Sequence, residues 1–424
     1  MSENIRRDAV TCALAGIAAV DPGDLVRRSL DQRAIHGNVT IIAVGKAAGP
    51  MASAALSVLG AAVSGGVLIS PDPVQLSPPL GRFVGGHPIP NERGAEGARE
   101  IEQIAHRLGA SDTLLCLVSG GASSLMTLPA EGISIDEMAS VTTLLLRAGA
   151  TIHELNCVRK HLDRLKGGRL AAAAFPARVI TLVLSDVVGD ALSTIASGPT
   201  VGDPTTIAEA IAVLESRHVW DRLPESVRAH LTTGTDESPK PGDARLARSD
   251  SYIIGSNVNA ADAARAQAES LGYAARVVTV CLSGEAKIVG GDIVRDVQAE
   301  VAREKKPVAL IYAGEPTVTV RGSGTGGRNQ ELVLGAAMAM DGARGIALAS
   351  LGTDGVDGPT DAAGAVADGE SISRARALHL DPSAALSAND THAFWKALGA
   401  LVRTGPTGTN VMDIVVALAV QPTA

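Results

Sequence analysis

The stretch IIAVGKAAGPM, residues 41–51, places a lysine directly after a run of apolar residues and a glycine. A continuous apolar run of β-branched and small residues predicts a buried strand, here expected over residues 39–45. A buried cation costs free energy unless a carboxylate or another anion meets it. The pattern therefore predicts a strand whose carboxyl end delivers Lys46 into a loop that meets an anion.

Similar apolar runs recur along the whole chain and predict nine strands. They lie at residues 39–45, 65–70, 113–121, 178–188, 250–257, 274–280, 307–315, 345–355 and 410–418. Continuous apolar runs are typical of parallel strands that are covered on both faces. The Ala-rich segments between them predict crossover helices, so we expect an α/β protein with a doubly wound sheet.

Two domains are expected for a chain of 424 residues, because single cores usually stop growing below this length. The segment 220–249 is rich in Pro, Asp, Ser and Gly, which is typical of a connection between domains. We therefore expect an N-terminal domain over residues 1–235, a linker over 236–249 and a C-terminal domain over 250–424.

The composition excludes several classes of protein. A hydrophobic content of 46% with 19% charged residues indicates a folded globular chain. The net charge of −8, without a Lys/Arg cluster, argues against nucleic-acid binding. The four scattered cysteines predict reduced thiols. The N-terminus MSENIRRDAV lacks a signal-peptide pattern, and no apolar run reaches the length of a membrane span. We expect a cytoplasmic protein.

Ligands of open α/β sheets bind beyond the carboxyl ends of the strands, so the loops that follow the strands are informative. SGGASSLM, residues 119–126, follows the third expected strand. Its glycines allow close backbone approach, and exposed N–H groups at a helix start bind anions. An ordinary glycine turn with a serine helix cap is the alternative. The candidate ligand-binding residues are Ser119, Gly120, Gly121, Ala122, Ser123 and Ser124.

Two loops carry carboxylates after strands. The first, LSDVVGDALSTIASGPT, contains Asp186 and Asp190 four residues apart. The second, LGTDGVDGPTDAAGAV, contains Asp354, Asp357 and Asp361. Carboxylate oxygens suit Mg²⁺, which usually takes one or two of them together with phosphate and water oxygens. Solvated loop acids are the alternative for both.

Two glycine patterns invite other interpretations. Gly45-Lys46 lacks the spacing of a Walker A loop. Gly322, Gly324 and Gly327 match the G-x-G-x-x-G pattern of dinucleotide-binding proteins, which would favour a nicotinamide-dependent reductase. The pattern is weak evidence among 46 glycines, and Asp354 follows it at more than the usual spacing of about 20 residues.

Several motifs follow one another in a single order: VGKAAGPM, GGHPIPNERG, LVSGGASSLM, NCVRKHLDRLKGGRLA, LVLSDVVGDALSTIASGPTVGD, SGEA, GRNQELVL and LGTDGVDGPTDAAGAV. This series resembles the class of glycerate 2-kinases that carry a C-terminal MOFRL domain, and the resemblance covers Val10 to Val420. It implies transfer of the γ-phosphoryl group of ATP to the C2 hydroxyl of D-glycerate. Some members of the class are named hydroxypyruvate reductase, which is the alternative function.

The resemblance also implies a fold and an assembly. It implies an N-terminal Rossmann-like domain, a smaller C-terminal α/β domain containing the MOFRL region, and an active site in the cleft between them. ATP and Mg²⁺ are the implied cofactors, and D-glycerate is the implied substrate. We expect no nucleic-acid or membrane partner, and a homodimer is left open.

Within this resemblance, individual residues take physical roles. Phosphoryl transfer depends mainly on positioning and charge neutralisation, which suits Lys46 as a compact cation. The backbone of residues 119–124 would hold nucleotide phosphates, and Arg328 would face the cleft with Lys46. Asp190 would orient or deprotonate the C2 hydroxyl. The metal candidates are Asp186, Asp354 and Asp357.

Two further residues have open interpretations. His87, in GGHPIP, is compatible with contact to glycerate and equally with a rigid turn. Arg159 lies in NCVRKHLDRLKGG with Lys160 and Arg164, at spacings typical of one helix. A solvated basic face is the default interpretation of these three, and capture of a substrate carboxylate is the alternative.

Overall fold

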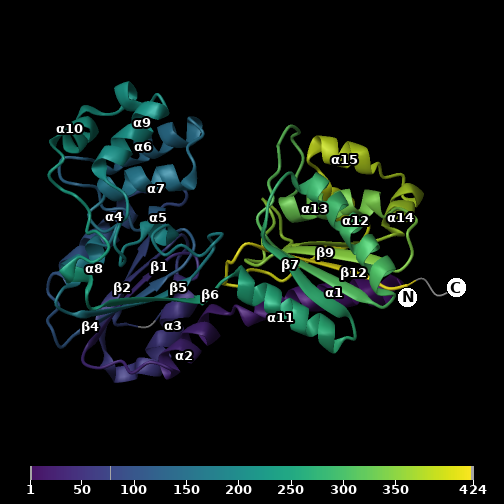
Figure 1. Ribbon diagram of the computed structural model, residues 1–424, viewed down its shortest axis with the longest axis horizontal. Helices are drawn as coiled ribbons and strands as arrows, with labels where there is room; N and C mark the ends of the chain where they lie inside the picture. Colours follow the sequence, from purple (N-terminus) through teal and green to yellow (C-terminus); the bar gives the residue numbers. More distant parts are fainter. Residues whose placement is uncertain (1, 77, 422–424) are drawn as a thin grey trace. The chain divides into compact units, whose positions relative to one another are not determined.

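The computed structural model describes residues 2–76 and 78–421. The chain forms two compact units, shown in Figure 1. The first unit is Pro22–Ile254, and the second unit combines Met1–Asp21 with Gly255–Ala424. These limits differ from the expected ones, because the N-terminal helix α1 (Ser2–Ala19) belongs to the C-terminal unit. The expected linker also differs, because it lies inside the first unit.

The first unit is built on a six-stranded sheet with the order β3-β2-β1-β4-β5-β6. Its strands are β1 (Val39–Val44), β2 (Val63–Ser70), β3 (Leu80–Val84), β4 (Thr113–Val118), β5 (Arg178–Leu184) and β6 (Ser249–Gly255). The pairs β1–β2, β1–β4, β2–β3 and β4–β5 are parallel. The strand order reverses between β1 and β4, which is the switch point where such sheets bind ligands. The predicted doubly wound sheet is confirmed here.

Helices cover both faces of this sheet (Figure 1). Ile42 and Val44 of β1 pack with Ala98 and Ile101 of α4 in one core. A separate group of helices packs around its own apolar core. The helices of the unit are α2 (Pro22–Asp31), α3 (Ala48–Leu59), α4 (Glu92–Ala105), α5 (Ala122–Leu125), α6 (Ile135–Arg147), α7 (Ile152–His161), α8 (Arg169–Ala174), α9 (Ile207–Ser216) and α10 (Glu225–Thr233).

The segment expected to be a linker is anchored by buried polar groups. The Ser238 hydroxyl donates to Asp203 Oδ2 at 2.9 Å. Lys160 Nζ donates to Asp203 Oδ1 at 3.1 Å. His161 Nε2 lies 2.8 Å from Glu237 Oε1. A composition rich in Pro, Asp and Gly predicts irregular backbone, but it says nothing about how tightly that backbone is held.

The second unit contains a six-stranded mixed sheet with the order β11-β10-β9-β12-β8-β7. Its strands are β7 (Ala274–Leu282), β8 (Val308–Gly314), β9 (Ile346–Gly352), β10 (Gly364–Asp368), β11 (Leu401–Val402) and β12 (Asp413–Ala419). β7 and β8 are parallel, whereas β12 is antiparallel to both β8 and β9. The expectation of parallel strands is therefore confirmed for β7 and β8 and wrong for the other strand pairs of this sheet. A fully apolar strand indicates that both faces are buried, and it does not fix the strand's direction.

This mixed sheet is the middle layer of the second unit (Figure 1). Leu310 and Val415 pack toward α12 and α13, whereas Ile311 and Val416 pack toward α1 and α11. The N-terminal helix joins this unit because its apolar side chains are buried against that second face. The other helices are α11 (Asn257–Ser270), α12 (Ala286–Glu304), α13 (Arg328–Ala339), α14 (Ser371–Ala377), α15 (Pro382–Ala388) and α16 (Thr391–Ala397).

In the described part of the chain, no individual helix has the length and apolar character needed to cross a membrane. The consecutive helices Glu3–Ala19 and Pro22–Asp31 pass that test only when they are taken together.

Candidate functional site

The loops after β1 and β4 are hydrogen-bonded to each other. Lys46 N donates to Gly120 O at 2.9 Å, and Ala47 N donates to Ser119 Oγ at 3.0 Å. Gly45 has a φ of 128°, and a Cβ at this position would overlap Ser119. Glycine is therefore required before Lys46. The structure brings Lys46 and the 119–124 loop together, as the sequence predicts.

The Lys46 side chain is exposed. Among the described residues of the first unit, no carboxylate forms an ion pair with it. This excludes, within that unit, the alternative of a structural lysine paired with an acid. A lysine held at a switch point without a partner is available to an external anion.

A hollow of about 330 Å³ opens beside the 119–124 loop. α5 begins after Gly121, which has a φ of 85° and provides no side-chain cap. Ser123 and Ser124, the two candidates for a serine cap, bond elsewhere: Ser123 Oγ contacts Ser197 Oγ, and Ser124 Oγ donates to Gly121 O at 3.2 Å. Among the described residues, the N–H groups of Gly120, Gly121 and Ser123 have no hydrogen-bond acceptor. Backbone donors of this kind are suited to bind an anion.

Arg159 of α7 lines the same hollow. Its guanidinium forms no hydrogen bond or ion pair with the residues that the structure describes. Burial lowers the pKa of Arg159 to about 10, although the charge of Asp163 acts in the opposite direction. The default interpretation of a solvated basic face is wrong for Arg159, because a partly buried cation without a partner costs free energy. An anion in the hollow would offset that cost.

The two basic neighbours of Arg159 are engaged within the protein. Lys160 is buried and pairs with Asp203. Arg164 donates through Nε and Nη2 to the two carboxylate oxygens of Glu102, at 2.9 and 2.7 Å. Only Arg159 of the three is therefore free to bind a ligand.

The imidazole of His87 packs on Gly121, where a Cβ would lie 2.9 Å from His87 Cδ2. Partial desolvation lowers the pKa of His87, and the positive charges of Lys46 and Arg159 lower it further. His87 is therefore neutral at pH 7, since its ordinary pKa is about 6.5. Between its folded-state pKa and about 6.5, the unfolded chain binds more protons, so His87 makes stability rise with pH in that window.

The His87 pKa is expected to rise when sulfate binds, because the anion offsets the charges of Lys46 and Arg159. Sulfate does not titrate in this range, so NMR titration of the His87 ring with and without sulfate measures the effect directly. The ring of His218, on the surface at the end of α9, serves as the control and should not respond. A His87 pKa at or above 6.5 without sulfate would contradict this electrostatic account.

Asp190 follows β5 in a left-handed backbone conformation with a φ of 52°. Its N–H donates to Val187 O at 3.1 Å. Its Oδ1 is buried and has no hydrogen-bond partner among the described residues. A buried acceptor without a donor is costly, so this oxygen is suited to receive a proton or a hydrogen bond from a ligand. Asp186 lines the hollow formed by the 119–124 loop.

Asp357, in the second unit, has a structural role. It is buried, and its carboxylate accepts from Asn329 N at 3.0 Å and Gln330 N at 2.9 Å. It also accepts from the side-chain amides of both residues. These donors occupy the lone pairs of both oxygens, so Asp357 caps α13 and does not fit the predicted role of metal ligand. Asp354 is partly exposed and accepts from Val356 N at 3.0 Å.

The glycines of the dinucleotide-like pattern serve close packing. A Cβ at Gly322 or Gly324 would overlap the backbone of Ala388, and a Cβ at Gly327 would overlap Asp357. Gly324 N donates to Ala388 O at 2.9 Å. The N–H groups at the start of α13 already donate to the Asp357 carboxylate. The feature that motivated a nicotinamide cofactor is therefore explained by packing within the protein.

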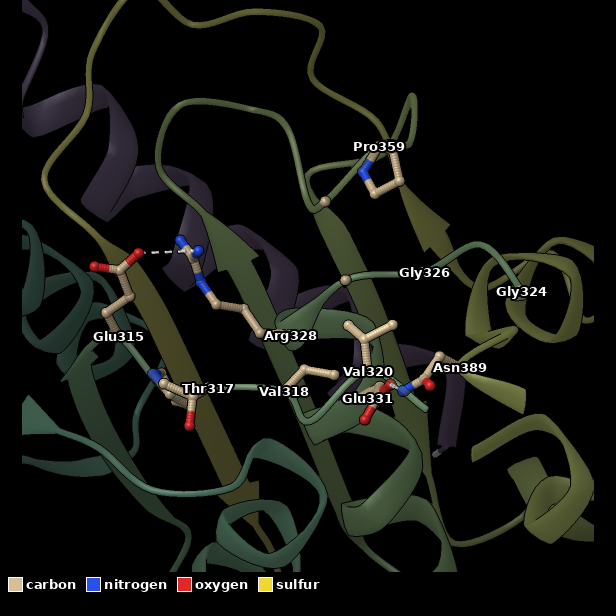
Figure 2. Close-up of a pocket in the computed structure, with 13 residues that line it drawn as sticks. Glu315, Thr317, Val318, Val320, Gly324, Gly326, Arg328, Glu331, Pro359 and Asn389 are labelled. Atoms are coloured by element: carbon tan, nitrogen blue, oxygen red, sulfur yellow. Dashed lines mark hydrogen bonds and ion pairs between the residues drawn. The ribbon is translucent and has the colours of Figure 1, made fainter. Parts of the chain in front are cut away.

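Arg328 binds a carboxylate that the sequence analysis missed. Its Nε and Nη2 donate to the two oxygens of buried Asp413 at 2.6 and 2.9 Å. Its Nη1 lies 2.9 Å from Glu315 Oε1, a contact drawn in Figure 2. Burial acts to lower the pKa of Arg328, but the bonds to Asp413 and the charge of Glu315 outweigh it and raise that pKa. Burial raises the pKa of Asp413 to about 6, against the opposing effect of Arg328. In the sequence, Asp413 is a single acidic residue at the start of an apolar strand, and this pattern could have identified it as a buried partner of a cation.

Comparison with known proteins identifies the family. Residues 8–232 match a domain of unknown function called DUF4147, and residues 308–413 match the MOFRL family. D-glycerate 2-kinase of Thermotoga maritima is 41% identical over 99% of both chains. The chain belongs to the MOFRL-containing glycerate 2-kinase family.

Solved and sequenced members of the glycerate 2-kinase family agree with this assignment. The crystal structure of glycerate kinase from Thermotoga maritima superposes with a TM-score of 0.92 at 41% identity, covering 99% of this chain and 100% of that one. Glycerate 2-kinase of Pyrococcus horikoshii is 41% identical over 91% of this chain and 88% of its own. A protein of Agrobacterium vitis with the provisional name hydroxypyruvate reductase is 40% identical over 94% of this chain and 91% of its own. The kinase names of the relatives are stronger evidence than this single provisional reductase name.

Replacing Arg328 with alanine is expected to destabilise this glycerate 2-kinase family member by about 3–5 kcal/mol at pH 7, because Asp413 would remain buried without its partner. The loss of stability should become smaller as the pH falls. In the folded variant the pKa of Asp413 would lie further above its unfolded value, so the buried carboxyl would be neutral at low pH. Denaturant unfolding at several pH values measures both effects. The double variant Arg328→Ala, Asp413→Asn is the control and should recover part of the loss. Equal stability of wild type and Arg328→Ala at pH 7 would show that the pair contributes nothing.

Proposed function

We propose that this glycerate 2-kinase family member transfers the γ-phosphoryl group of ATP to the C2 hydroxyl of D-glycerate, giving 2-phosphoglycerate and ADP. The observation that carries the proposal is the hollow beside the 119–124 loop. It presents unpaired backbone donors and the unpaired cation of Arg159, with Lys46 on the adjoining loop. Phosphoryl transfer needs such groups, because its catalysis rests mainly on positioning and charge neutralisation.

Each group has a role in the proposed reaction. The N–H groups of Gly120, Gly121 and Ser123 bind anionic oxygens of the nucleotide. Lys46 Nζ neutralises negative charge on the transferred group. The buried Oδ1 of Asp190 accepts the proton of the C2 hydroxyl, or orients that hydroxyl for attack.

Arg328 has fewer guanidinium N–H groups available to a ligand than the sequence suggests. Two of its nitrogens are engaged by buried Asp413. Its Nη1 lies 2.9 Å from Oε1 of the exposed Glu315. The predicted catalytic role of Arg328 therefore depends on this one edge of the guanidinium.

Mg²⁺ is compatible with part of the predicted ligand set. The described residues contain no group of three His, Cys, Asp or Glu side chains arranged to hold a metal by themselves. Mg²⁺ usually takes one or two carboxylates and completes its shell with phosphate oxygens and water. We propose Asp186 as its carboxylate, with Asp354 as the second candidate. When bound, the ion neutralises charge on the nucleotide phosphates.

Incubation of the pure protein with ATP, Mg²⁺ and D-glycerate tests the reaction directly. ³¹P NMR should show ADP and 2-phosphoglycerate, and an incubation without D-glycerate should show neither. Phosphorylation at C3 alone, or no transfer at all, would overturn the proposal. Hydroxypyruvate-dependent loss of NAD(P)H absorbance would support the reductase instead. Cytoplasmic location and homodimerisation remain predictions.

Arg159→Ala is expected to raise KM for D-glycerate about tenfold to a hundredfold, because a hydrogen bond to a charged group contributes about 1.5–3 kcal/mol. The reason is that Arg159 is the free guanidinium in the hollow, and we assign it to the substrate carboxylate. Initial rates at varied D-glycerate measure the effect. Arg147→Ala, an exposed arginine at the end of α6, is the control and should behave as wild type. An unchanged KM in Arg159→Ala would remove Arg159 from substrate binding.

A further inference from the structure

A second hollow, of about 540 Å³, lies in the second unit beside the start of α13 (Figure 2). Residues 315–320, which follow β8, form one wall, and the glycine-rich segment 324–327 forms another. Glu331 and Asn389 lie next to each other in the wall, close to Val320 (Figure 2). Its size lies within the range of small-molecule sites in proteins.

The charges of this hollow differ from those of the hollow beside the 119–124 loop. Its one cation, Arg328, is already paired with Asp413 and Glu315. Its other charged groups are the carboxylates of Glu315 and Glu331. An anionic ligand group is therefore disfavoured here, whereas the first unit offers unpaired cations to such groups. This hollow therefore suits an uncharged ligand group.

Apolar side chains form much of the surface of this second hollow. They are Pro316, Val318, Val320 and Pro359. Val320 leaves 74% of its surface exposed, which is unusual for a valine in the wall of a concave site. An exposed apolar wall in a concave site favours a ligand with a flat or apolar part.

The carboxylate of Glu331 favours a ligand that can donate a hydrogen bond in this hollow. It is 1% exposed, and its Oε1 accepts from Asn389 Nδ2 at 2.7 Å. Its Oε2 has no hydrogen-bond partner among the described residues. Burial raises the pKa of Glu331. An unmet acceptor of this kind is costly, so the site gains most from a ligand that brings a hydrogen-bond donor.

We propose that this hollow binds a purine nucleoside group. The base packs on Val318 and Val320, and an exocyclic amino or ribose hydroxyl group donates to Glu331. A nucleoside combines a flat apolar ring with such donors and carries no charge, which matches the wall and the absence of a free cation. The inference rests on the proposed kinase function and adds the part of the enzyme that recognises the donor.

Adenosine is the probe, because it lacks phosphates and so reports on this hollow alone. Calorimetric titration of the full-length protein should detect adenosine binding. Glu331→Gln should weaken it about tenfold to a hundredfold, because the amide places an N–H donor where a carboxylate oxygen faced the ligand. Val320→Trp should also weaken it by filling the hollow, and this exposed position keeps the substitution away from the core. Both variants should raise KM for ATP and leave KM for D-glycerate unchanged.

Glu269→Gln, an exposed glutamate on α11 in the same unit, is the matched control and should bind adenosine as wild type does. Absence of adenosine binding to wild type, or equal binding by wild type, Glu331→Gln and Val320→Trp, would overturn the inference. If adenosine binding is lost in both variants while D-glycerate is not phosphorylated, the nucleoside site stands and the proposed reaction falls.

Discussion

Lys46→Ala is expected to lower kcat about a thousandfold, the order of effect seen when a group that stabilises developing charge is removed. The reason is that Lys46 lies at the sheet's switch point, beside the backbone donors of Gly120 and Gly121, and pairs with no carboxylate among the described residues of the first unit. Because its side chain is exposed, its loss should change the free energy of unfolding by less than about 0.5 kcal/mol.

Three variants separate catalysis from folding in this experiment. Lys46→Arg keeps the charge but replaces a compact ammonium with a planar fork, so we expect partial activity. Lys306→Ala removes an exposed lysine of the second unit and should leave kcat unchanged. Rates of 2-phosphoglycerate formation and denaturant unfolding curves are needed for each. Turnover of Lys46→Ala close to that of wild type would remove Lys46 from the mechanism.

The sequence predicts strand positions well because the buried strands of both sheets are continuous apolar runs. All nine expected strands occur, with limits that move by a few residues. The missed strands are β3, β10 and β11. β3 has only one buried residue, and β11 has two residues that are both half-buried. β10 is short and rich in Gly and Ala, so its composition differs little from that of the surrounding loop.

Strand direction and unit boundaries required the structure. The direction of β12 depends on which strands it meets, and an apolar sequence carries no such information. Likewise, α1 belongs with the C-terminal sheet because its apolar face packs there. That contact joins segments at opposite ends of the chain, and a boundary drawn by composition cannot detect it.

The candidate site was predictable where it follows from topology. Lys46, Ser119 and Asp190 lie in loops after β1, β4 and β5, and the carboxyl ends of parallel neighbours meet at one edge. For Arg159 substrate binding was only the alternative to a solvated face, and Glu331 was not proposed as a site residue, because both lie on helices whose local sequence resembles an ordinary polar face. Among the described residues, the partly buried Arg159 guanidinium and the buried Glu331 Oε2 have no hydrogen-bond partner. Burial is a property of the folded chain.

Asp190→Asn is expected to lower kcat about a hundredfold to ten-thousandfold, the range typical of losing a general base. Asparagine keeps the shape of the side chain and tolerates a positive φ, so the loop should keep its conformation at Asp190. It also removes a buried carboxylate oxygen that has no partner among the described residues, so stability should be unchanged or higher. A variant that is stable but inactive would identify the carboxylate as functional.

Asp190→Ala completes this test by separating the chemistry from the backbone. It removes the carboxylate too, but it also places alanine in a left-handed conformation, which costs about 1–2 kcal/mol. We therefore expect both variants to be inactive and only the alanine variant to unfold at lower temperature. Rates across a range of pH should lose their dependence on an acidic group in Asp190→Asn. If Asp190→Asn instead keeps the rate and pH profile of wild type, the proton of the C2 hydroxyl goes to another acceptor. The burial of Asp190 Oδ1 without a partner among the described residues would then reflect the packing of this loop and not catalysis.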